Sequence, residues 1–341
     1  MYSSKYIILF CLSLFLINCN NNETQKSSLA IATNSKTFTL GDTLKLSIKN
    51  PKQLDITSTT YLLDGKNVNE ISKLSEVTLG EKELMAKVEV NGKTETISTS
   101  IKVYNNKIPS IYTYEIVNTY PHDITSYTQG LEFFEGELYE STGQKKESKL
   151  RKVNFETGEV LKNIDLNDSY FGEGLTILNE KIYQLTWQAN TGFVYDVDSF
   201  EKLSTFKYGK SKEGWGLCND GKKLYKSDGT EKIWILNPKN LTEEGFIEAY
   251  TEKGKIPSLN ELEWINGKIY ANIYQKNGVA IINPKNGGVE GVVDFSPLKK
   301  LVKQHDELDV LNGIAYHPKR NTIFVTGKNW DKLFEVTIKK K

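Results

Sequence analysis

Apolar and polar residues alternate along most of the chain in short runs, and one arrangement of these runs occurs five times. The first copy, residues 128–142, has an apolar run, a polar turn at Glu135-Gly136 and a second apolar run. Two alternating runs joined by a short polar turn are the pattern of a β-hairpin. The later copies start at Gly172, Gly214, Asn260 and Leu311.

The spacing of the five hairpins predicts a propeller. Steps of 44, 42, 45 and 52 residues separate the equivalent positions Gly130, Gly174, Gly216, Glu261 and Gly313. Repeats of this length, with two more strands after each hairpin, are typical of four-stranded blades. Only one strand follows the last hairpin, and an early strand at 112–119 has no hairpin of its own. We expect these two strands to pair, which completes blade five and closes the ring.

The strand pattern also divides the chain into two domains. Residues 29–104 hold short alternating strands with turns such as Asp64-Gly65 and Asn91-Gly92, which fit an immunoglobulin-like sandwich. Residues 111–341 hold the five hairpins. The predicted fold is therefore all-β, a five-bladed β-propeller preceded by a small immunoglobulin-like β-sandwich. We interpret the sandwich as a spacer or interaction domain, because the sequence shows no chemistry in it.

The first residues predict export. Lys5 precedes an apolar run of about 12 residues, so residues 1–18 have the pattern of a signal peptide, too short to be a stable membrane span. Leu16-Ile17-Asn18-Cys19 resembles a bacterial lipobox, which predicts acylation of Cys19 and a polar tether over residues 19–28. This places the protein on the bacterial cell envelope, at the outer membrane or in the periplasm. The alternative is an ordinary cleaved signal peptide with a chance cysteine.

Charge and composition narrow the partners. The 44 basic and 43 acidic residues nearly cancel, and the only basic block is the tail 339–341, which disfavours a nucleic-acid partner. Beyond the export segment Cys218 is the one thiol, so a disulfide framework is excluded. The three histidines lack paired ligand spacing, and no zinc site is expected. His122 and His317 lie beside prolines and are expected to be turn residues. We expect a monomer.

Unusual residues precede the inner strand of each repeat. Most are flanked by glycines, and they carry aromatic, amide or carboxylate groups: Tyr127, Gln129, Phe171, Glu173, Trp215, Asn260 and Glu261. Inner strands line the channel of a propeller, so these positions converge on one axis. An apolar pocket with a few polar groups is the usual small-ligand site. The alternative is that these side chains only pack the blades together.

Five segments resemble the glutaminyl cyclases of the plant and bacterial type, which are five-bladed propellers. They are Pro121-His122-Asp123, Tyr127-Thr128-Gln129-Gly130-Leu131, Phe171-Gly172-Glu173-Gly174-Leu175-Thr176, Gly214-Trp215-Gly216-Leu217 and Leu259-Asn260-Glu261-Leu262-Glu263-Trp264. The resemblance covers residues 111–341 and says nothing of residues 1–110. It implies a glutaminyl-peptide cyclotransferase, an acyltransferase that converts the N-terminal glutamine of peptides or proteins to pyroglutamate (5-oxoproline) and releases ammonia.

The resemblance also implies the site. Glu173 matches the essential carboxylate of the family. The implied substrate-binding residues are Tyr127, Gln129, Phe171, Trp187, Trp215, Asn260, Tyr274 and Lys328. Two of these depart from the plant members, because Tyr127 stands where they have phenylalanine and Tyr274 where they have tryptophan. Both departures keep an aromatic wall.

The chemistry of these residues suits the reaction. One carboxylate in an apolar pocket can take a proton from the attacking amine and return it to the leaving nitrogen. Gln129, Asn260 and Lys328 are candidates to stabilise the oxyanion. No cofactor or metal is required for this route, although a structural ion in the propeller channel stays open.

Two other functions stay open at this stage. The first is a lipid-anchored propeller that binds a peptide or glycan without chemistry. The second is a calcium-dependent lactonase-type hydrolase, which needs several carboxylates and amides around one ion. Glu173 and Asn260 are candidate ligands for that ion, but the sequence shows no full set.

Overall fold

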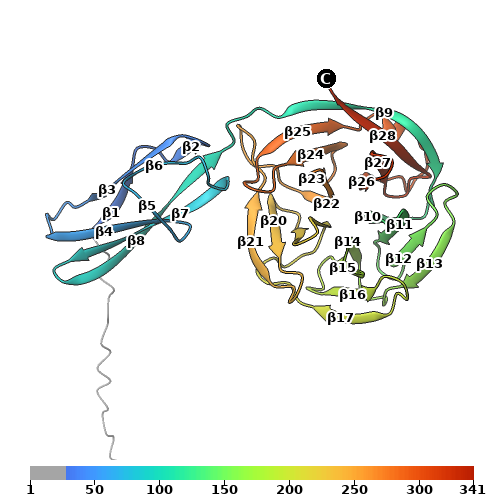
Figure 1. Ribbon diagram of the computed structural model, residues 1–341, viewed down its shortest axis with the longest axis horizontal. Coiled ribbons are helices and arrows are strands. Elements are labelled where there is room, and N and C mark those ends of the chain that lie inside the picture. The colour runs from blue at the N-terminus through green and yellow to red at the C-terminus, as the bar shows by residue number, and fades with distance from the viewer. Residues whose placement is uncertain (1–27) are drawn as a thin grey trace, which may run out of the picture.

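The computed structural model of the protein describes residues 28–341. These residues form two β-rich bodies that lie side by side, a sandwich and a ring of blades (Figure 1). Among them only the 3-10 turn η1 (Leu298–Lys300) is helical, and no helix is long and apolar enough to cross a membrane. The predicted signal peptide, lipidation site Cys19 and nearly all of the tether lie outside the described residues.

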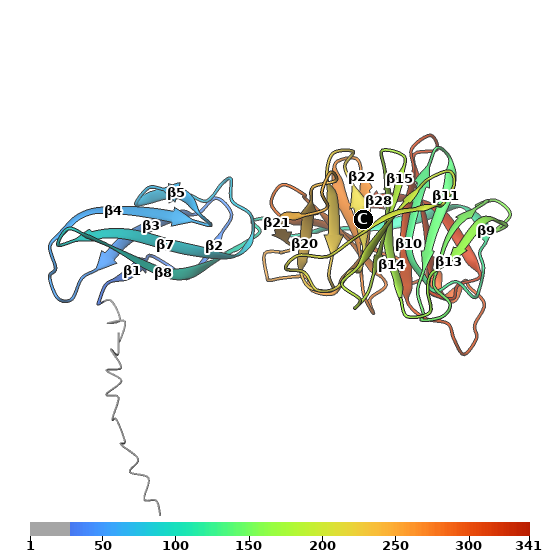
Figure 2. The same ribbon diagram turned by 90° about the horizontal axis from the view of Figure 1, so that it is seen from below.

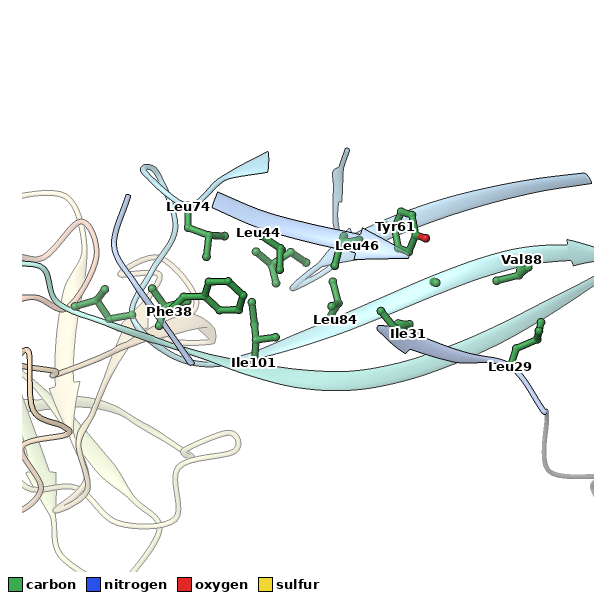
Figure 3. Packing of buried hydrophobic residues seen from close by; sticks show 14 of the residues in the cluster. Leu29, Ile31, Phe38, Leu44, Leu46, Tyr61, Leu74, Leu84, Val88 and Ile101 are labelled. Carbon is green, nitrogen blue, oxygen red and sulfur yellow. The ribbon is translucent and has the colours of Figure 1, made fainter. Parts of the chain in front are cut away.

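The N-terminal body is a sandwich of two sheets. The smaller sheet has the order β1 (Ala30–Thr33), β3 (Thr43–Lys49), β6 (Ile71–Lys73). The larger has the order β2 (Thr37–Thr39), β8 (Lys93–Tyr104), β7 (Gly80–Val90), β4 (Ile56–Leu63), β5 (Lys66–Val68). In β7 every second side chain is buried, as a strand with one covered face requires. Leu44, Leu84 and Ile101 meet between the sheets (Figure 3).

The C-terminal body is a five-bladed propeller, which confirms the predicted fold class. Its first three blades are four-stranded sheets. Blade one is β10 (Thr128–Phe134), β11 (Glu137–Thr142), β12 (Lys149–Val153), β13 (Val160–Asp165), and blade two is β14 (Gly172–Leu178), β15 (Lys181–Thr186), β16 (Gly192–Asp196), β17 (Lys202–Phe206). Blade three is β18 (Leu217–Asn219), β19 (Leu224–Ser227), β20 (Lys232–Leu236), β21 (Glu243–Glu248). Blade four is β22 (Leu259–Ile265), β23 (Lys268–Ile273), β24 (Gly278–Ile282), β25 (Val289–Asp294). Blade five is β26 (Leu311–His317), β27 (Thr322–Gly327), β28 (Lys332–Lys340) and β9 (Ser110–Pro121).

The early strand β9 closes the ring. It runs antiparallel to β28, with Pro121 opposite Lys332 and Tyr112 opposite Lys340, so it is the outer strand of blade five, as the sequence pattern predicts. Its first residues also pair in parallel with β25, which joins blades four and five into one eight-stranded sheet. The repeat pattern gives no sign of this second pairing, because it lies between blades rather than within one.

The sandwich is attached to the rim of the propeller (Figure 2). The amide N–H of Leu79, in the turn before β7, donates to the carbonyl of Asn286 at 2.8 Å. The side-chain amide of the buried Asn105 donates to the carbonyl of Val289 at 3.1 Å. Tyr104 meets Tyr250 edge to face, with ring centroids 5.8 Å apart. The two bodies therefore share polar and aromatic contacts beyond the linker itself.

Glycines let the inner strands approach one another at the axis. A methyl group added at Gly130 would lie 2.5 Å from the amide nitrogen of Leu175, and one at Gly174 would lie 2.6 Å from that of Leu217. At Gly216 it would lie 2.0 Å from the carbonyl oxygen of Asn260. Neighbouring blades thus touch backbone to backbone here, which fixes the side chains beside these glycines relative to one another.

Candidate active site

One cavity of about 170 Å³ opens where the inner strands begin. Its lining is Tyr127, Gln129, Phe171, Glu173, Trp187, Trp215, Asn260, Tyr274 and Lys328. Every residue that the resemblance implies for the site is therefore brought together, and all five blades contribute. The start of an inner strand and the end of the next strand lie at the same edge of an antiparallel hairpin, which is why residues from both positions meet.

Glu173 is the carboxylate of the cavity. It lies in β14 between two glycines and is only 4% exposed. Its Oε1 accepts a hydrogen bond from the amide of Gln129 at 3.1 Å, whereas Oε2 is buried with no hydrogen-bond partner among the described residues. Burial raises the pKa of Glu173 well above its ordinary value, although the Lys328 ammonium opposes this and Glu213 adds to it. The carboxyl thus holds protons more tightly than an exposed glutamate and has one oxygen free for a bound molecule.

The amide of Gln129 is held in one orientation by Asn312. The side-chain nitrogen of Asn312 donates to Oε1 of Gln129 at 3.1 Å and to the carbonyl of Thr128 at 2.9 Å. The carbonyl end of Gln129 is therefore engaged, and its NH₂ group faces Glu173.

Asn260, from β22, has a buried Oδ1 with no partner in the described part of the chain. The site thus offers a second free oxygen acceptor near Glu173.

Sequence reasoning missed Asn312, although the repeat contains the signal. When the five hairpins are aligned, Asn312 of the fifth occupies the position of Gln129 in the first, because each precedes the reference glycine by one residue. Glu261 shows the opposite error. It was expected among the cavity residues, but its carboxylate accepts the backbone N–H of Ile314 at 3.0 Å and lies outside the cavity lining.

Lys328 is a buried cation between two tyrosines. Its Nζ lies 4.6 Å from the ring centre of Tyr127 and 5.2 Å from that of Tyr274, within the range of cation–π attraction. Burial lowers the pKa of Lys328, and the carboxylates of Glu173 and Asp309 oppose this. Asp309 also accepts the hydroxyl of Tyr127 at 2.8 Å, so this tyrosine has a polar partner. The charged segment 299–309 before β26 thereby reaches the rim of the cavity.

Aromatic rings form the remaining walls. Phe171 contacts Trp187 with ring centroids 5.5 Å apart, and Trp215 contacts Tyr274 at 5.6 Å. Both indole N–H groups donate to one oxygen of Glu213. The repeat pattern gives no signal for Glu213, because a glutamate in a loop before a glycine is ordinary. Aromatic rings thus make up most of the apolar lining of the cavity, and Glu173 lies among them.

The other candidate polar residues have structural partners. His122 is not a simple turn residue: its ring nitrogens contact Glu140 at 3.1 Å and the carbonyl of Trp330 at 2.8 Å, and Glu140 raises its pKa against the effect of burial. His317 packs against Phe133. Within residues 28–341 no group of three or more His, Cys, Asp or Glu side chains is arranged to hold a metal ion.

Glutamine cyclotransferases are similar to this chain in both sequence and fold. The glutamine cyclotransferase family model matches residues 84–338. A glutaminyl-peptide cyclotransferase of Arabidopsis thaliana is 40% identical over 229 residues, which are 66% of this chain and 71% of that protein. The crystal structure of the Myxococcus xanthus glutaminyl cyclase is 36% identical, with a TM-score of 0.64, and the match covers 68% of this chain and 99% of that one. The chain belongs to the glutamine cyclotransferase family.

Proposed function

We propose that this protein is a glutaminyl-peptide cyclotransferase in which Glu173 carries the proton between the two nitrogens of the substrate. The observation that supports this role most strongly is the state of Glu173 itself. Its carboxyl is buried, has a raised pKa, and keeps one oxygen free in an aromatic cavity. A general acid–base group works best when its pKa lies near the working pH, and burial moves this carboxyl in that direction.

In the proposed reaction the N-terminal glutamine is folded back on itself. Its α-amine nitrogen attacks the side-chain Cδ, forming the new C–N bond of a five-membered ring, and the Glu173 carboxylate takes a proton from that nitrogen. The tetrahedral intermediate then collapses with cleavage of the original C–N bond, and Glu173 returns the proton to the leaving nitrogen. The products are pyroglutamate and ammonia, and the enzyme ends in the state in which it began. The free oxygens of Glu173 and Asn260 are the acceptors available to the amine.

The remaining lining residues serve the geometry and the charge. The buried Lys328 ammonium is a candidate to stabilise the oxyanion, because a fixed charge acts more strongly at a buried position than in water. Phe171, Trp187 and Trp215 give a slot that favours the flat, folded-back conformer. Holding that conformer is much of the task, since a well-oriented intramolecular attack already has a high effective molarity.

The substrate test uses three peptides that differ only in the first residue. N-terminal glutamine peptides of varied sequence are expected to lose one ammonia by mass spectrometry. N-terminal asparagine peptides are expected to be refused, since they would have to form a four-membered ring. N-terminal glutamate is expected to react very slowly at neutral pH, because a carboxylate is a poor electrophile and repels Glu173. Binding of all three without a change in mass would support a binding module and contradict the enzyme.

Turnover is expected to be independent of added metal. The route above passes only through side chains of the cavity, so dialysis against a strong chelator should leave kcat and KM unchanged. A structural ion in the channel, if one is bound, would appear as a lower melting temperature after dialysis with activity retained at moderate temperature. Loss of activity that calcium or zinc restores would favour the hydrolase alternative.

We also propose that the enzyme is exported and anchored through an acylated Cys19. The lipobox-like segment and the polar residues that follow it support this placement. Cys19→Ser is expected to move the protein from the membrane fraction to the soluble fraction, while Cys218→Ser, at the buried thiol of the propeller, should leave fractionation unchanged. If Cys19→Ser fractionates like the wild type, the proposal of a lipid anchor at Cys19 is wrong.

A further inference from the structure

One carboxylate oxygen joins the two tryptophan walls of the cavity. Oε2 of Glu213 accepts the indole N–H of Trp187 at 3.0 Å and that of Trp215 at 2.9 Å. Trp187 follows β15 in blade two, whereas Trp215 precedes β18 in blade three. The contact therefore fixes the spacing of two walls that belong to different blades. Hydrogen bonds to a charged acceptor are stronger than those between neutral groups.

Further contacts hold both the backbone and the side chain of Glu213. Its backbone carbonyl accepts a hydrogen bond from Nζ of the fully buried Lys226 at 2.7 Å. Lys226 lies 4.3 Å from the ring centre of Tyr208, whose hydroxyl contacts the carbonyl of Thr186 at 2.9 Å, next to Trp187. The other oxygen of Glu213 accepts the amide of Gln188 at 3.3 Å. The backbone that carries this carboxylate is therefore anchored to a buried lysine.

We propose that Glu213 is a positioning residue of the cyclase, which fixes the two indole walls and, through its negative charge, tunes proton transfer at Glu173. This inference rests on the proposed function only for its kinetic consequences. Without Glu213 the two half-buried indole N–H groups would lose the charged acceptor that they share, which is costly. The walls would then turn to find other partners, and the slot would lose its fit to the folded-back substrate.

The charge of Glu213 affects the pKa of Glu173 in a definite direction. Glu213 raises the pKa of Glu173, whereas Lys328 lowers it. Other titratable groups near the pair are Tyr127 and Tyr208, on which the Glu173 charge acts, and Lys226, whose pKa burial lowers to about 8. Asp309, whose carboxylate acts on Lys328, and Tyr274, in the cavity lining, also lie close. Removing the Glu213 charge leaves Lys328 less opposed, so the pKa of Glu173 must fall. The acidic limb of kcat/KM then moves to lower pH. The substrate amine contributes equally to every variant and cancels in the comparison.

The experiment compares Glu213→Gln and Glu213→Ala with the wild type on one N-terminal glutamine peptide. Glu213→Ala is expected to lower kcat/KM by about 10- to 100-fold, the scale of a small misplacement in an active site. Glu213→Gln keeps the size and loses the charge, and it should shift the acidic limb to lower pH with a smaller loss of rate. Glu201→Gln, an exposed carboxylate on the neighbouring blade, is the charge control and should change neither quantity.

A double-mutant cycle separates positioning from a general structural role. Trp187→Phe with Trp215→Phe keeps two aromatic rings and removes both N–H donors. If Glu213 acts through the indoles, adding Glu213→Ala in that background should cost far less than it costs alone. The proposal would be overturned if Glu213→Ala lowers kcat/KM as much in that background as it does alone, and Glu213→Gln leaves the acidic limb of kcat/KM unmoved. Melting curves check that each variant is folded, and Glu213→Gln keeps the test valid if Glu213→Ala is not.

A readout on the resting protein keeps this inference distinct from the function. Ultraviolet resonance Raman spectra report the hydrogen bonding of indole N–H groups. Glu213→Ala is expected to weaken that signal for two tryptophans, and Glu201→Gln is expected to leave it as in the wild type. Unchanged indole spectra in Glu213→Ala would contradict the shared hydrogen bonding of both indoles to Glu213. A wild-type protein that shows these hydrogen bonds but does not cyclise glutamine would contradict the proposed function instead.

Discussion

Replacing Glu173 by glutamine is expected to lower kcat on N-terminal glutamine peptides by about 10²- to 10⁴-fold, the range for loss of a general acid–base group. The amide has nearly the same shape, so it should keep the contact with Gln129 and bind substrate with little change in KM. It cannot take a proton from the amine or return one to the leaving nitrogen. Ammonia release under saturating peptide measures the effect. Near-wild-type turnover by this variant would contradict the role of Glu173.

Two further variants sharpen that result. Glu173→Asp is expected to be poor as well, because the shorter side chain withdraws the carboxyl from both nitrogens. Glu132→Gln is the matched control, since Glu132 is another buried carboxyl on an inner strand, with a pKa raised by burial to about 7, and it lies outside the cavity lining. It should retain wild-type kcat. Equal losses in Glu132→Gln and Glu173→Gln would indicate a general effect of buried charge rather than catalysis.

The raised pKa also predicts the sign of a stability change. Between the ordinary glutamate pKa, about 4.3, and the raised value in the fold, the folded protein binds more protons at Glu173 than the unfolded chain. Stability contributed by this site therefore falls as pH rises through that window. Glu173→Gln removes the effect, so above the window it should melt at the same temperature as the wild type or higher. A loss of activity with unchanged or increased stability identifies a functional residue rather than a structural one.

Gly216→Ala is expected to destabilise the propeller by about 1–3 kcal/mol or more, the cost of overpacking a closed site. The added methyl group would meet the carbonyl of Asn260 at 2.0 Å and the Cα of Glu261 at 2.7 Å, and both are backbone atoms that cannot rotate away. Blades three and four must separate, and Asn260 moves with them. We therefore expect a lower melting temperature and a higher KM in the same variant.

Gly245→Ala is the matched control for this substitution. Gly245 lies in the outer strand β21, has an ordinary φ, and a methyl group there would meet nothing within 4 Å. Replacing such a glycine reduces the freedom of the unfolded chain, so this variant should be neutral or stabilised by roughly 0.4–1 kcal/mol. Chemical denaturation of the two variants gives the comparison. A stable Gly216→Ala protein with normal KM would show that the backbone contact at the axis does not position Asn260.

The fold was predictable because hairpin periodicity depends on local residues. Alternation and turn residues mark each hairpin, and the unpaired early strand and the incomplete last repeat together indicate ring closure. The parallel pairing of β9 with β25 and the docking of Leu79 on Asn286 were not predictable, since each joins segments with no local signal of contact. A repeat pattern describes pairing inside a blade and leaves contacts between bodies undetermined.

The site was predictable in two unequal parts. Starts of inner strands, such as Gln129 and Glu173, follow from the repeat itself. Trp187, Tyr274 and Lys328 follow second strands and were found only through resemblance to a family. Glu213 could not be found from either source, because its importance arises from two indoles that meet only in the folded ring.

Infrared spectroscopy tests directly whether burial keeps a proton on Glu173 at a pH where an exposed glutamate has lost it. The difference spectrum between the wild type and Glu173→Gln, with isotope-labelled glutamate carboxyl groups, isolates this side chain. A carboxylic acid band is expected to persist well above a pH of about 4.3 and to disappear only as pH rises through the raised pKa. A spectrum that shows ionised carboxylate alone from about that pH upward would contradict it.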